Sequence, residues 1–118
     1  MSQDRPTAAE LVRAVRDLLK TQVLEKLEGS AQFHTRVSIN VLGIVARELE
    51  LGPALDLSEQ ARLERLLGVE GPLPELQAAL ARGIRDGSLD DRRDAVLEHV
   101  RQTVREKLQV ANPGYASE

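Results

Sequence analysis

The chain has 118 residues, the size of one ordinary domain, which is enough to bury a core without disulfides. Aromatic residues make up only 2% of it and there is no cysteine, so the core must be aliphatic, and disulfides, thiolate metal sites and cysteine nucleophiles are excluded. The formal net charge is −3 with acids and bases interspersed, which argues against a nucleic-acid-binding protein.

The first predicted helix begins at Thr7. Thr7 and Glu10 have the T-x-x-E spacing of a capping box, in which each residue satisfies a free backbone N–H group. Gly29 follows the last apolar residue and should end the helix. The apolar residues between them recur at helical spacing and are expected to face the core: Leu11, Val12, Val15, Leu18, Leu19, Val23 and Leu27.

A second helix is predicted from about Ser30 to Leu51, because Gly52-Pro53 should stop it. A short third helix should span residues 58–67 and end at Gly68. The apolar stripe of the second helix is Phe33, Val37, Val41, Leu42, Ile44, Val45 and Leu49.

Two more helices complete the pattern. Pro74 suits the first turn of a helix that Gly87 stops, and Asp90 or Asp91 should cap the last one. The last helix should end at Asn112-Pro113-Gly114, and its predicted inward face is Val96, Leu97, Val100, Val104 and Leu108.

No segment alternates apolar and polar residues over the length of a strand. The sequence therefore predicts an all-α fold, a compact five-helix bundle with three long and two short helices. We expect a single domain over residues 1–118, ordered from about 7 to 111, with frayed termini. The N-terminus lacks an apolar signal region and no window suits a membrane span, so a cytoplasmic protein without membrane contact is expected.

No known catalytic or phosphate-binding motif occurs in the sequence, and neither His34 nor His99 has metal-ligand spacing. No catalytic residue, metal or cofactor is therefore expected. His99 lies at the edge of an apolar stripe and is expected to be exposed.

The second predicted helix carries two polar residues inside its apolar arc, His34 and Glu48, which lie 14 positions or roughly 21 Å apart. A buried carboxylate needs a partner. Lys26, Arg93 or Lys107 could supply it. Three interpretations stay open: a structural ion pair with a hydrogen-bonded core histidine, a ligand pocket, or acid–base catalysis.

Asn40, Gly43 and Arg47 form a second line on the same helix. They are either a solvated edge, with the glycine merely tolerated, or a surface that another backbone approaches closely. Ile39 and Leu24 point off their stripes, which favours a contact between copies or with another protein.

Three stretches of the sequence resemble an uncharacterised family of small bacterial helical domains. They are the opening Arg5-Pro6-Thr7-Ala8-x-Glu10-Leu11, the run Phe33-His34-x-Arg36-Val37-x-x-Asn40-x-Leu42-x-Ile44-Val45-x-Arg47-Glu48-Leu49, and the end Val104-Arg105-x-Lys107-Leu108-x-Val110-Ala111-Asn112-Pro113-x-Tyr115. The resemblance implies a companion of aminoglycoside-phosphotransferase-like kinases and acyl-CoA dehydrogenases, and it gives no catalytic residues.

The leading hypothesis is a non-catalytic accessory module that binds such an enzyme, or itself, through a helix face. The alternative is a small-molecule-binding protein or minor enzyme of acyl-CoA metabolism, in which His34, Asn40, Arg47 and Glu48 line a polar pocket on the second helix. An arginine there could hold a carboxylate or phosphate.

Overall fold

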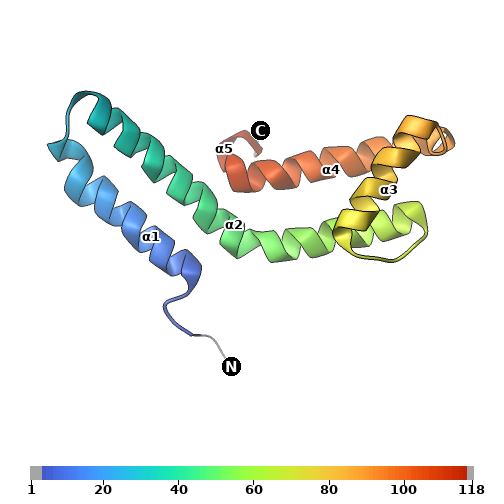
Figure 1. The fold of residues 1–118 in the computed structure, drawn as a ribbon, viewed down its shortest axis with the longest axis horizontal. Helices are drawn as coiled ribbons and strands as arrows, with labels where there is room; N and C mark the ends of the chain where they lie inside the picture. The colour runs from blue at the N-terminus through green and yellow to red at the C-terminus, as the bar shows by residue number, and fades with distance from the viewer. Residues whose placement is uncertain (1–3, 117–118) are drawn as a thin grey trace. The chain divides into compact units, whose positions relative to one another are not determined.

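The computed structural model describes residues 4–116, which form helices and connecting turns without a strand. The predicted all-α class is therefore confirmed over this range. In chain order (Figure 1) the elements are α1 (Ala8–Leu18), η1 (Leu19–Val23), η2 (Leu24–Lys26), α2 (Gly29–Leu67), α3 (Leu73–Asp86), η3 (Asp90–Arg92), α4 (Arg93–Ala111) and α5 (Pro113–Ala116). No helix in the described range has the length and apolar character needed to cross a membrane.

α1 begins as the sequence predicts. The Thr7 hydroxyl accepts a hydrogen bond from the Glu10 amide at 3.1 Å, and the Glu10 carboxylate accepts one from the Thr7 amide at 2.7 Å. After Leu18 the winding widens into the π-helical η1 and then tightens into the 3₁₀ turn η2. Gly29, at φ +61°, opens the next helix in a conformation that suits glycine.

α2 runs without interruption through Gly52 and Pro53, so the prediction of separate helices at 30–51 and 58–67 is wrong. Gly52 is not among the glycines with positive φ and does not act as a helix stop. Proline inside a helix removes a hydrogen bond and costs about 3 kcal/mol. The helix nevertheless continues, with a fully buried residue on each side of the proline, Ala46 before it and Leu63 after it.

The other end of the chain also differs from the prediction. The segment expected to fray after α4 contains the short helix α5. The last long helix begins with the 3₁₀ turn η3, so Asp90 and Asp91 lie in this turn, just before α4 starts at Arg93.

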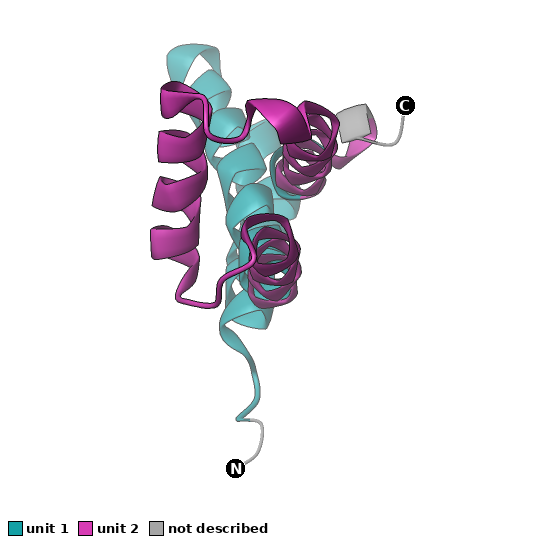
Figure 2. Ribbon diagram, turned by 90° about the vertical axis from the view of Figure 1, so that its right-hand side faces the viewer, with its two compact units in different colours: residues 1–52, 110–112 teal, residues 53–109, 113–118 magenta. Residues whose placement is uncertain are grey.

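The chain divides into two compact units, shown in Figure 2. Unit 1 comprises the chain up to Gly52 together with Val110–Asn112, and unit 2 comprises Pro53–Gln109 and the chain from Pro113. The single domain expected from the sequence stays a prediction.

In unit 1, α1 lies along the first half of α2 (Figure 1). Ala9, Ile39 and Ala46 are buried, and a Cβ atom placed on Gly43 would lie 3.4 Å from a guanidinium nitrogen of Arg16. The atoms that this Cβ would meet belong to the side chains of Arg16 and Arg47, so the close approach of another backbone expected at Gly43 stays a prediction. Of the apolar residues predicted to face inward, Leu11, Val15 and Leu18 are half exposed instead. The other four are partly buried: Val12, Leu19, Val23 and Leu27.

In unit 2, the core is aliphatic, as the composition predicts. Its buried side chains come from the second half of α2, from α3 and from α4: Leu63, Leu66, Leu76 and Val96.

Gly83 of α3 gives the first testable prediction. A Cβ atom at this position would lie 2.6 Å from Leu89 Cδ1 and 2.8 Å from its Cγ, so the whole leucine side chain would have to move. We expect Gly83→Ala to lower the free energy of unfolding by about 1–3 kcal/mol, as overpacking does. Gly52→Ala is the matched control, because its Cβ meets only Glu48 Cγ at 3.8 Å and alanine favours the helix by about 0.5–1 kcal/mol. Chemical denaturation measures both, and equal effects would contradict the packing at Gly83.

Candidate functional site

A buried polar cluster joins α2 to α4 within unit 2. Its centre is an ion pair between Arg62 and Glu106, whose side chains are only 16% and 10% exposed. The two guanidinium NH₂ groups reach the two carboxylate oxygens at 2.9 and 3.1 Å, a two-pronged geometry that gives strong hydrogen bonds. Gln102 donates a further hydrogen bond to this carboxylate at 3.3 Å.

The other N–H groups of Arg62 are also engaged. They donate to the hydroxyls of Ser58 at 2.9 Å and Thr103 at 3.0 Å, and to Nδ1 of His99 at 3.4 Å. Because Nδ1 accepts a hydrogen bond, the proton of a neutral His99 lies on Nε2, which faces the Thr103 hydroxyl at 3.4 Å. A protonated Nε2 cannot take a proton from that hydroxyl, so the pair does not form a nucleophile and its base.

The cluster changes two pKa values. Burial in the protein and the positive charge of Arg62 lower the pKa of His99 below its ordinary value of 6.5. Burial by itself would raise the pKa of Glu106. The hydrogen bonds from Arg62 and Gln102 and the charge of Arg62 outweigh it, and the pKa falls below 4.5.

These shifts predict how stability depends on pH. Between the folded pKa of His99 and 6.5, the unfolded chain binds more protons at this residue than the folded chain does, so stability rises with pH and is complete above about 6.5. Glu106 acts in the same direction below about 4.5. We expect the free energy of unfolding to fall in two steps as pH is lowered from 7, and His99→Gln to remove the first step alone. Urea titrations across this range measure it, and an unchanged first step in the variant would contradict the assignment.

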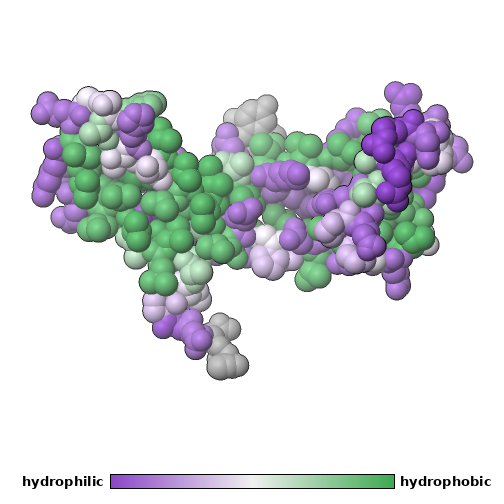
Figure 3. Space-filling view, in the orientation of Figure 1, coloured by the Kyte–Doolittle hydropathy of each residue, from purple (hydrophilic) through white to green (hydrophobic). Residues whose placement is uncertain are grey.

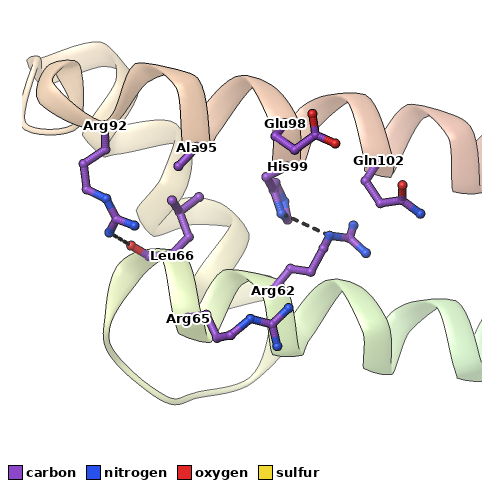
Figure 4. A pocket seen from close by; sticks show the side chains of 8 residues that line it. All are labelled: Arg62, Arg65, Leu66, Arg92, Ala95, Glu98, His99 and Gln102. Carbon is purple, nitrogen blue, oxygen red and sulfur yellow. Dashed lines mark hydrogen bonds between the residues drawn. The ribbon is translucent and has the colours of Figure 1, made fainter.

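An open cleft of about 490 Å³ lies beside the cluster (Figure 4). Arg92 crosses one end of it and donates to the carbonyl of Leu66, near the C-terminus of α2, where a cation is favourable. The remaining lining residues are Arg62, Arg65, Ala95, Glu98, His99 and Gln102. Among residues 4–116, no three His, Asp or Glu side chains lie together as metal ligands would.

The second notable feature is an exposed apolar surface on unit 1, which we call the hairpin face. Figure 3 shows apolar residues gathered over α1 and the first half of α2. The hairpin face consists of large apolar side chains, each between 43% and 60% exposed: Leu11, Val15, Leu18, Phe33, Val37, Val41 and Leu49. These seven side chains are apolar and lie at least two-fifths exposed on the described part of unit 1.

The structure separates the five residues predicted as a ligand- or partner-binding site. His34, Asn40 and Glu48 are exposed, Gly43 is buried against α1, and the Arg47 side chain is half buried. Nε of Arg47 donates to the carbonyl of Val110 at 2.7 Å, within unit 1. The expected burial of His34 and Glu48 is therefore wrong. The three residues considered as partners for Glu48 are exposed as well: Lys26, Arg93 and Lys107.

The residues of the polar cluster were not predicted from the sequence. His99 was expected to be exposed and is 7% exposed. The signal lies in α4, where Val96, His99, Thr103 and Glu106 follow the spacing i, i+3, i+7, i+10 of a single helix face. The partner of this face, Arg62, was assigned to a short separate helix.

These observations define a small all-α protein that carries a structural ion-pair cluster and an exposed apolar helix surface. A family model described as a domain of unknown function, DUF6285, matches residues 25–115, and the chain belongs to this family. Comparison with curated proteins and with solved structures gave no significant match.

Proposed function

We propose that the protein is a non-catalytic helical interaction module that works while bound to another protein chain. The observation that carries this proposal is the hairpin face. Apolar residues recur along α1 and α2 at helical spacing, yet they are exposed instead of facing a core.

The energetics favour a covered face. Fully burying a Val, Leu or Phe side chain is worth about 1.5–3 kcal/mol, and seven such side chains on the hairpin face are about half exposed. A protein that covered them would gain several kcal/mol from apolar burial alone. The apolar residues that the sequence predicts to be buried would then be buried against another chain.

The resemblance of the sequence supports a specific choice of partner. We propose an aminoglycoside-phosphotransferase-like kinase or an acyl-CoA dehydrogenase, with the cytoplasm as the compartment. Neither the buried cluster nor the hairpin face presents a reactive group, which suits an accessory role.

Co-purification tests this proposal. The tagged chain is co-expressed with the phosphotransferase-like kinase or the acyl-CoA dehydrogenase, and a Val15→Asp variant is compared with Lys20→Asp. Val15 is half exposed on the hairpin face and Lys20 is exposed outside it, so neither change disturbs the core. We expect the wild type and Lys20→Asp to retain the enzyme and Val15→Asp to lose it. Failure of the wild type to retain either enzyme, or equal retention by Val15→Asp, would contradict the proposal.

The geometry gives less support to the alternative, a small-molecule-binding protein or minor enzyme of acyl-CoA metabolism. Arg47 already donates to Val110, and the side chains of His34, Asn40 and Glu48 are exposed. A thermal-shift series with CoA esters and nucleotides separates the two proposals, since a bound ligand raises the melting temperature.

A further inference from the structure

We infer that two copies of this chain pair through the first half of α2, with the two helices antiparallel about a two-fold axis at Val41. The contact is the α2 stripe, which we define as His34, Val37, Val41, Val45 and Glu48. This inference rests on the proposed interaction function and names one partner for it, a second copy of the chain.

The α2 stripe lies on one narrow side of the helix. At about 100° per residue, its five positions fall within a sector roughly 80° wide. The buried residues of this half of α2, namely Ile39, Gly43 and Ala46, lie on the opposite side. Val37 and Val41 are 43% and 49% exposed. His34 and Glu48 are exposed as well, and Val45 is partly buried. Within unit 1, the stripe is therefore a second face of α2, distinct from its buried side.

The order of residues in the stripe is symmetric about Val41. His34 precedes Val41 by seven positions and Glu48 follows it by seven, or roughly 10.5 Å on either side. Val37 and Val45 are four positions before and after. When two copies lie antiparallel about this point, Val41 meets Val41 and Val37 meets Val45 of the second copy.

The same register places His34 of each copy opposite Glu48 of the other. Within the residues described, neither side chain forms an ion pair or a hydrogen bond, and the histidine ring only contacts Phe33, edge to face at 5.5 Å. A parallel pair would place histidine against histidine and glutamate against glutamate. Only the antiparallel pair brings hydrogen-bonding partners together at both ends and valines together between them.

This arrangement accounts for the two polar residues in an apolar arc. Isologous contacts use the same patch on both copies, and each residue that contacts a second one is contacted by it in turn. In the antiparallel pair, His34 of each copy contacts Glu48 of the other, so this reciprocal contact forms twice per dimer. Polar pairs at the ends of an apolar seam also fix its register and orientation.

Cysteine cross-linking tests the axis directly, because the chain has no cysteine of its own. A Val41→Cys variant places two thiols next to each other at the two-fold axis, within the Cα separation that a disulfide spans. We expect mild oxidation to convert this variant into a covalent dimer. Arg36→Cys is the control: it is exposed on another side of the same helix and should stay monomeric on a non-reducing gel.

Charge exchange tests the register. His34→Glu places carboxylates opposite each other, and Glu48→Lys places a lysine opposite the histidine. We expect the first to raise the dimer dissociation constant about tenfold or more, and the double variant His34→Glu/Glu48→Lys to restore it to within about threefold. Sedimentation equilibrium measures all four proteins. A double variant weaker than both single variants, or a Val41→Cys protein that does not cross-link, would overturn the inference.

The outcomes also separate this inference from the proposed function. A wild-type monomer that still retains the kinase or dehydrogenase, and loses it on Val15→Asp, would refute the pairing and leave the interaction module standing. A dimer of the expected register that retains neither enzyme would support the pairing and refute the kinase and the dehydrogenase as partners.

Discussion

Replacing Arg62 by alanine should lower the free energy of unfolding by about 3–5 kcal/mol. The change leaves the Glu106 carboxylate 10% exposed without its cation, and an unpaired buried charge is among the most costly defects a fold can carry. It also removes the donors that Ser58, Thr103 and His99 use. Urea denaturation followed by circular dichroism measures the loss.

Two controls make this result specific. Arg105→Ala removes an arginine of α4 that lies 3.9 Å from Glu98 at the surface, and it should change stability by less than about 1 kcal/mol. The double variant Arg62→Met/Glu106→Met removes both charges and should recover most of the loss, because apolar side chains of similar volume replace a buried pair well. A single Arg62 variant as stable as the wild type would show that the cluster does not hold α2 to α4.

Leu63→Ala should cost about 2–5 kcal/mol of unfolding free energy. Leu63 is 0% exposed, and truncating a buried leucine loses its transfer free energy and leaves a cavity. Leu57→Ala is the matched control on the same helix, since Leu57 is 67% exposed and should change stability by no more than about 0.5 kcal/mol. Thermal and urea unfolding compare them. Equal effects would place Leu63 outside the core of unit 2.

The local signals in the sequence predicted the ends of several helices. The Thr7–Glu10 capping box forms as expected. Glycines predicted at helix boundaries have positive φ: Gly29, Gly68 and Gly87. These features depend on neighbouring residues alone, which is why sequence spacing is sufficient to find them.

The continuation of α2 through Gly52-Pro53 could not be predicted in this way. The local penalty of proline is real, yet α2 continues through Gly52 and Pro53 as one helix. A local signal gives only the cost of proline at its own position, so it could not reveal this continuation.

Hydrophobic periodicity identified which faces of the helices are apolar, but not what covers them. The buried residues of α1 and of the first half of α2 are Ala9, Ile39, Gly43 and Ala46, while larger residues such as Leu11, Val15 and Leu18 stay half exposed. The same reasoning explains the polar cluster: a histidine and a glutamate on α4 are buried because Arg62 faces them, and no signal within α4 reveals that partner.

The most direct test of the account is the mass of the purified wild-type chain at sedimentation equilibrium. The α2 stripe predicts a species of twice the 13.0 kDa chain mass, which reverts to 13.0 kDa when Val41 is replaced by aspartate. A mass of 13.0 kDa at every concentration for the wild type, or a dimer that Val41→Asp does not dissociate, would contradict it.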